Sequence, residues 1–120
     1  MKSYGREERL RPKKARAKMN SRKKGAQGER ELAEELRKWG YKTRRGQQYS
    51  GANGDADVVG VPGLHIECKR VEKLNIDQAL QQSIRDSQSE IPVVMHRRNR
   101  EIWKVTLRLD DFMELWIKLT

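Results

Sequence analysis

Apolar and polar positions along the chain alternate in a way that predicts a series of helices and strands. Within residues 24–39, the apolar residues follow the three-, four- and seven-residue spacings of one helical face: Ala26, Leu32, Ala33 and Leu36. Gly40 comes next, and glycine is common just beyond a helix end because it readily adopts positive φ. The pattern therefore predicts a helix over 24–39 that buries one side.

Two runs rich in Val, Ile and Leu stand on either side of Pro62-Gly63, which is a turn signal, and they predict a β-hairpin. The other apolar segments predict a strand at 41–45, a second helix at 76–88, and strands at 91–96 and 101–108. Asp110 is expected to cap a last amphipathic helix. This order of elements predicts a single α/β domain in which helices flank a central mixed β-sheet.

Three residues of the predicted hairpin form a pattern suited to chemistry at a phosphodiester. Glu67 and Lys69 are two residues apart on the second strand and therefore project from the same face. Asp57, near the start of the first strand, is brought beside them by antiparallel pairing. Carboxylate oxygens are the ligands that Mg²⁺ selects, and a lysine stabilises developing negative charge.

Two alternatives apply to this hairpin. Glu67 and Lys69 together are also compatible with a surface ion pair of little energetic value. Asp55 competes with Asp57 for the ligand role, but two valines directly follow Asp57 and place it within the strand. We therefore favour Asp57.

Glu29 lies on the same face of the first predicted helix as the apolar positions. A carboxylate on a core-facing stripe needs a partner, because burying an unpaired charge is costly. In the first turns of a helix the same side chain is also favoured in solvent by the helix dipole. Because of the acidic hairpin, we interpret Glu29 as a third member of the site. The other acids of this helix are expected to pair with its own basic residues: Glu31, Glu34 and Glu35 with Arg30, Arg37 and Lys38.

The segment 46–54 is polar and contains three glycines, so it is predicted to be a loop. Such a backbone approaches a phosphate closely, although most loops of this kind are flexible connections. Its position directly before the acidic strand favours a role at the site.

Charge is unevenly distributed along the 120 residues. The chain holds 27 Lys and Arg against 17 Asp and Glu, and residues 1–24 contain 11 of those basic residues but only 2 of the acids. This segment has one aromatic and few large apolar residues, too few to fold alone. We expect residues 1–22 to be a flexible arm that binds DNA and residues 23–120 to form the folded domain.

Several classes of protein are excluded by composition. No stretch approaches the roughly 20 apolar residues that span a bilayer, and the basic amino terminus is not followed by the apolar segment of a secretory signal. We therefore expect a cytoplasmic protein. The single cysteine, Cys68, allows no intrachain disulfide and alternates toward the core. His65 is expected in solvent, and Trp103 and Trp116 in the core or at a dimer interface.

The order of Glu29, Asp57 and Glu67-Cys68-Lys69 resembles the PD-(D/E)XK nuclease superfamily, and within it the archaeal-type Holliday junction resolvases, including versions carried by phages. The resemblance covers residue 24 to about residue 94. Five segments carry it: Lys-Gly-Ala-Gln-Gly-Glu-Arg-Glu-Leu at 24–32 is similar to the opening helix, Ser50-Gly51 to the catalytic loop, 57–60 to the acidic strand, 66–69 to the E-x-K strand, and 91–94 to the strand after the second helix.

The resemblance implies a restriction-endonuclease-like fold and a defined activity. Members of that family are homodimers that bind four-way DNA junctions and cut two opposing strands symmetrically, using Mg²⁺ or Mn²⁺ and no small-molecule cofactor. Carried over by position, the residues that hold the metal would be Glu29, Asp57, Glu67 and the carbonyl of Cys68. Lys69 would orient water or stabilise charge, and Ser50 would touch the scissile region. Basic residues around these motifs are expected to contact DNA: Lys23, Lys24, Arg30, Arg44 and Arg45.

Two other functions fit parts of the same sequence. One is a nuclease of this superfamily that acts on other DNA structures, and the other is a non-catalytic nucleic-acid-binding module. The acidic cluster argues against the module, because three carboxylates near a phosphate repel it unless a metal ion is present.

Overall fold

The structure, a computed structural model, describes residues 13–47 and 56–120, with side chains from residue 23 onward. Its elements follow the predicted order: α2 (Lys13–Arg37), β1 (Arg44–Arg45), β2 (Val58–Val59), β3 (Leu64–Arg70), α3 (Ile76–Asp86), β4 (Ile91–Arg97), β5 (Lys104–Thr106) and α4 (Leu109–Leu119). No helix in the part of the chain that the structure describes is long and apolar enough to cross a membrane.

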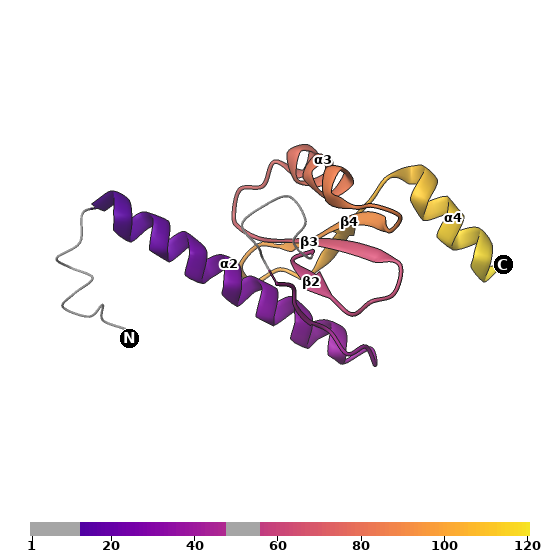
Figure 1. The fold of residues 1–120 in the computed structure, drawn as a ribbon, viewed down its shortest axis with the longest axis horizontal. Helices are drawn as coiled ribbons and strands as arrows, with labels where there is room; N and C mark the ends of the chain where they lie inside the picture. Colours follow the sequence, from indigo (N-terminus) through magenta and orange to yellow (C-terminus); the bar gives the residue numbers. More distant parts are fainter. Residues whose placement is uncertain (1–12, 48–55) are drawn as a thin grey trace.

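The five strands form one mixed sheet in the order β1-β2-β3-β4-β5. β2 pairs antiparallel with both β1 and β3, which confirms the predicted hairpin, and β5 pairs antiparallel with β4. β3 and β4 are parallel, and α3 supplies the crossover that a parallel pair requires. Figure 1 shows α2 and α3 on opposite sides of the sheet, while α4 extends away from it at the carboxyl-terminal end.

One hydrophobic core joins α2 to the sheet. Leu32 and Ala33 of α2 are each 1% exposed and pack in one cluster with buried residues of β2, β3 and β4. On β3 the members of this cluster are Ile66 and Cys68, which are two residues apart and so share a face. Cys68 is a buried thiol, as predicted, and burial raises its pKa.

α3 covers the opposite side of the sheet through Ala79 and Ser83, which are both buried. The Ser83 hydroxyl lies within hydrogen-bond distance of two main-chain carbonyl oxygens, 3.2 Å from that of His65 and 3.1 Å from that of Val93. One side chain of α3 therefore links the two parallel strands near their amino-terminal ends. His65 is 6% exposed, so the expectation that it lies in solvent was wrong.

The first helix begins at Lys13, eleven residues before the predicted start at Lys24. Residues 13–22, expected to belong to a flexible arm, therefore continue the helix. The interval 13–24 contains no Gly or Pro, and its Ala, Lys, Arg and Met residues are good helix formers. A segment with few large apolar residues can still extend a helix that is already folded, because extension costs less than nucleation.

Helix ends also differ in detail from the prediction. α2 ends at Arg37, and a turn then leads to Gly40, whose φ of 95° is the left-handed conformation expected beyond a helix. α4 begins at Leu109, with Arg108 at the cap position and no side-chain cap hydrogen bond. Asp110 was wrongly predicted as the cap. It lies in the first turn, where its charge still interacts favourably with the helix dipole.

Candidate active site

The β2–β3 hairpin places Asp57 directly opposite Glu67. Val58 pairs with Ile66, so the antiparallel register sets residue 57 against residue 67. The Asp57 amide donates to the Ile66 carbonyl at 3.0 Å, and the Cys68 amide donates to Asp57 Oδ2 at 2.9 Å. The first bond holds the Asp57 main chain against β3, and the second holds its carboxylate there. The competing candidate, Asp55, lies outside the described residues.

Glu67 and Lys69 share a face of β3, as their spacing predicts. Lys69 Nζ lies 3.8 Å from Glu67 Oε1, and Glu67 is only 5% exposed. The alternative of a solvent-exposed surface pair is thus wrong for the carboxylate. An acidic side chain with so little contact with water is a costly feature, and it suits a site that receives a cation.

Glu29 reaches the same region from α2. Gly28 makes this possible, because a Cβ at that position would lie 2.6 Å from the Cβ of Arg70 on β3. Only a residue without a side chain permits α2 to approach β3 so closely. The carboxylate of Glu29 accepts a hydrogen bond from Arg45 Nε at 2.9 Å, so β1 holds it from the other side.

The electrostatics of the three acids are coupled. Burial raises the pKa of Glu67 to about 8, and the charge of Asp57 and a hydrogen bond with Asp57 add to the effect, while Lys69 opposes it. The pKa of Glu29 is also raised, chiefly by burial; the hydrogen bond from Arg45 opposes this, and the charge of Asp57 adds to it. Near neutral pH the protein alone therefore keeps a proton on Glu67.

These acids line one cleft of about 730 Å³. Its remaining walls come from the middle of α2, the end of β3 with the residues just after it, and the turn after β4. They are Lys24, Gly25, Gln27, Glu31, Cys68, Lys69, Arg70, Val71, Glu72 and Asn99. Glu29, Asp57, Glu67 and Lys69 therefore meet at one place, as predicted, although they come from two separate parts of the chain. Ser50 lies outside the described residues.

Within the described residues, no three His, Cys, Asp or Glu side chains stand ready as an ion-binding group. Asp57 and Glu67 form an adjacent pair of hard oxygen donors, and a divalent cation can replace the proton that Glu67 keeps near neutral pH. Glu29 is instead engaged by Arg45. The donor set of Asp57 and Glu67 thus fits Mg²⁺.

A second charge cluster at the cleft was missed by the sequence analysis. Glu31 Oε1 accepts from Arg97 Nη2 at 2.7 Å and from Arg70 Nε at 3.2 Å, instead of pairing within its own helix. Arg70 Nη1 also donates to the side-chain oxygen of Asn99 at 2.6 Å. The main-chain N–H of Asn99 donates to the Glu72 carboxylate. This network fixes the turn after β4 beside the cleft. Its partners are distant in sequence, so no local spacing indicates them.

The residues predicted to contact DNA differ in their surroundings. Lys23, Lys24, Arg30 and Arg44 are exposed, and Lys24 lines the cleft. Arg45 is partly buried and bound to Glu29, so it serves first as the partner of an acid. DNA contact by all five stays a prediction.

A mixed five-stranded sheet between helices, with Asp and E-x-K acids meeting in one cleft, defines a restriction-endonuclease-like nuclease domain of the PD-(D/E)XK class. The sequence matches the family described as "Phage putative PDDEXK endonuclease" over residues 20–120. The chain belongs to this family of endonucleases.

The fold is also similar to a solved structure of Hjc from Archaeoglobus fulgidus, a Holliday junction resolvase from an archaeal hyperthermophile. The TM-score is 0.54 at 25% sequence identity, and the similarity covers 70% of this chain and 72% of that one. No curated protein matches the sequence. The predicted superfamily and the restriction-endonuclease-like fold are both confirmed.

Proposed function

We propose that the protein is a metal-dependent endodeoxyribonuclease that resolves four-way DNA junctions by paired, symmetric nicks, and that it acts as a homodimer. The observation that carries the proposal is the buried Glu67 opposite Asp57, with Lys69 3.8 Å away, in a cleft of about 730 Å³. The similarity to an archaeal resolvase favours a junction over other DNA as substrate.

The chain's own side chains have separate tasks in this proposal. Asp57 and Glu67 would hold Mg²⁺, or Mn²⁺ in its place, with the Cys68 carbonyl and Glu29 as further ligands. When bound, such an ion polarises a phosphoryl oxygen and makes water a better nucleophile.

Lys69 orients the attacking water or stabilises the negative charge that develops on the phosphate. Ser50, in the loop before Asp57, touches the scissile region. Arg45 keeps Glu29 from repelling the incoming phosphate until the ion is present. The basic residues at the start of α2 draw the DNA backbone toward the cleft, because phosphate contacts release bound counterions.

A gel assay tests this function. The substrates are a four-way junction, a linear duplex, a flap and a single strand of matched sequence, each with Mg²⁺ or with EDTA. We expect two symmetric nicks in the junction with Mg²⁺, none with EDTA, and little cutting of the other substrates. Equal cutting of linear duplex or flap would point to a nuclease for other DNA, and binding without any cutting would point to a non-catalytic module.

Asp57→Asn provides the matched variant. It removes one charge at the site, so cleavage should fall by at least about 100-fold while junction binding survives, because ligand loss removes an interaction needed for the reaction. The control is Asp77→Asn, a change of an exposed acid in the first turn of α3. Full cleavage by Asp57→Asn in Mg²⁺ would refute the assignment of the site.

A further inference from the structure

α4 is the one described helix that buries no residue. It extends from the end of the sheet away from the rest of the molecule (Figure 1). A helix of 11 residues is marginal in water by itself, because most helical stability in proteins comes from packing one face against another element. α4 therefore lacks, within the described chain, the packing that helices of its length need.

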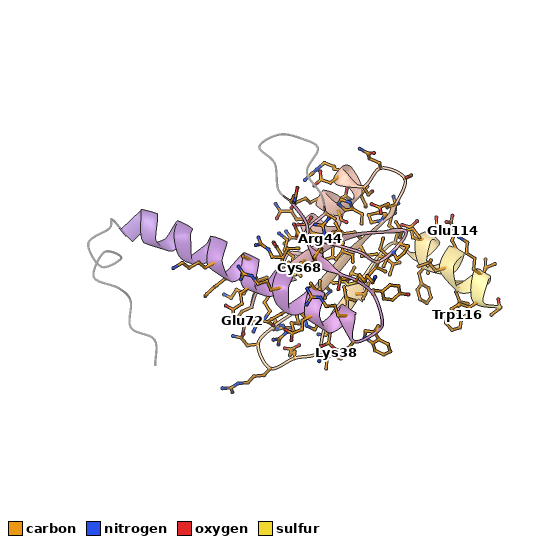
Figure 2. All side chains as sticks on the ribbon, turned by 60° about the horizontal axis from the view of Figure 1, so that its bottom comes forward. Lys38, Arg44, Cys68, Glu72, Glu114 and Trp116 are labelled. Carbon is orange, nitrogen blue, oxygen red and sulfur yellow. The ribbon has the colours of Figure 1, made fainter. Side chains whose placement is uncertain are left out.

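One side of α4 is a continuous apolar surface, which we call the α4 face. Its members are large and substantially exposed: Leu109 71%, Phe112 44%, Met113 41%, Trp116 51% and Ile117 66%. Their spacings of three, four and seven residues place them on one side of the helix. In Figure 2, Trp116 and Glu114 project from opposite sides of α4, so the polar and apolar sides are distinct.

The α4 face is large enough to need a partner. Phe112 and Trp116 stack with ring centroids 6.0 Å apart, and aromatic side chains bury about 150–250 Å² each when they are covered. With the three aliphatic members, the exposed apolar area is on the order of 500 Å², which is at the upper end for a monomer's largest patch. A standard interface buries about 800 Å² per partner, so the α4 face supplies the apolar centre of one.

Charge indicates which partner fits. The chain carries a formal charge of +10, but α4 holds three acids and one lysine. This acidic helix repels DNA, so the α4 face does not belong to the nucleic-acid surface. Two copies that meet there bring together helices of net charge −2, which repel each other less than the basic surfaces of two chains with a charge of +10.

The arrangement of apolar positions along α4 suits a second copy. A two-fold axis beside residue 114 makes two α4 helices antiparallel and brings residue i of one copy opposite residue 228 − i of the other. Phe112 then meets Trp116, and Leu109 meets Leu119, which is 76% exposed. Met113 meets Leu115, so four of the five members of the α4 face have an apolar counterpart across the axis, and Ile117 lies opposite Asp111.

We propose that the α4 faces of two copies pack antiparallel and form the homodimer. The inference rests on the proposed function in one respect, since paired nicks require two sites, and it deepens that function by naming the surface that couples them. Its measurement does not depend on cleavage. A monomer that still cuts junctions would refute the α4 dimer and leave the nuclease site standing, and a dimer that cuts nothing would refute the nuclease site and leave the α4 dimer standing.

Sedimentation equilibrium of the full chain tests the dimer. At micromolar concentration the wild-type protein should have twice the mass of one chain, and Trp116→Glu should raise the dissociation constant at least about 100-fold. Trp39→Glu is the matched control, because Trp39 is 76% exposed and follows α2, outside the α4 face. Circular dichroism checks that Trp116→Glu stays folded, as expected for a residue outside the core. A monomeric wild-type protein, or a dimeric Trp116→Glu, would overturn the proposal.

Cysteine cross-linking tests the orientation. Met113→Cys lies close to the proposed axis, so two copies should form a disulfide under mild oxidation. Leu109→Cys lies at the helix end, where antiparallel packing holds the two thiols too far apart to bond. The native Cys68 is buried and does not compete. Cross-linking at both positions would indicate parallel helices, and cross-linking at neither would refute contact through the α4 face.

Discussion

Replacing Glu67 by glutamine should stabilise the metal-free protein at alkaline pH while it abolishes cleavage. Glu67 is 5% exposed, and burial with the neighbouring Asp57 raises its pKa from 4.5 to about 8. Between these pH values the folded protein keeps a proton that the unfolded chain releases. The free energy of unfolding of the wild-type protein must therefore fall as the pH rises through this window.

The size of the effect follows from the same two pKa values. Each pH unit between them corresponds to about 1.4 kcal/mol, so the full loss above pH 8 is on the order of 4–5 kcal/mol. Glutamine does not ionise, and its amide can donate to Asp57 in place of the proton. The variant should therefore lose little stability across the window. For a domain of this size, each kcal/mol shifts the melting temperature by about 4–8 °C.

Thermal and urea unfolding in EDTA, from pH 5 to pH 8.5, measures this difference. The two proteins should be similar near pH 5, and the Glu67→Gln variant should melt at least about 10 °C above the wild type at pH 8.5. Added Mg²⁺ should stabilise the wild type at pH 8.5 far more than the variant, because only the wild type offers both carboxylates. Glu34→Gln, a change of an exposed acid on α2, is the control. Parallel curves for wild type and Glu67→Gln would refute the proton kept by the buried Glu67.

Three further predictions address the parts that surround the site. Gly28→Val should push α2 away from β3 at Arg70, lower the free energy of unfolding in urea by about 1–3 kcal/mol and reduce cleavage. Gly25→Ala is the control, because a Cβ there meets nothing within 4 Å. Equal effects of the two changes would contradict the close approach of α2 to β3 at Gly28. Ser83→Ala leaves two buried carbonyls without their hydroxyl partner and should lower the free energy of unfolding by about 1–3 kcal/mol in the same assay. A change below the error of measurement would show that Ser83 does not stabilise the pairing of the two parallel strands. Removing residues 1–22 should weaken junction binding and flatten its dependence on salt in a binding titration, since each lost phosphate contact lowers the slope by about 0.9; an unchanged slope would show that this segment does not touch DNA.

Much of the site was predictable because it lies on one hairpin. The turn at Pro62-Gly63 sets the antiparallel register, which places Asp57 opposite Glu67. The two-residue period of a strand puts Glu67 and Lys69 on one face. The core position of Cys68 follows from the same period. These are short-range consequences of backbone geometry, and the sequence contains all the information that they need.

Other features could not be predicted, because they depend on how helices and strands that are distant in sequence pack against one another. Glu31 bonds Arg70 and Arg97 of two strands, although local spacing favours partners in its own helix. The buried position of His65 follows from α3 covering that side of the sheet. The extension of α2 back to Lys13 is a further case. A polar segment with good helix propensity can be either helical or flexible, and an adjoining folded helix favours the helical state.

By itself, then, the sequence determined the order of elements, the acidic hairpin and the superfamily, because periodicity and turn chemistry act between near neighbours. Only the tertiary structure decided that Glu29 is bonded to Arg45 of β1, that Glu67 is buried deeply enough to hold a proton, and that α4 is left with an uncovered apolar side. Each of these depends on which surfaces meet, and that is fixed by packing of the whole domain rather than by any local pattern.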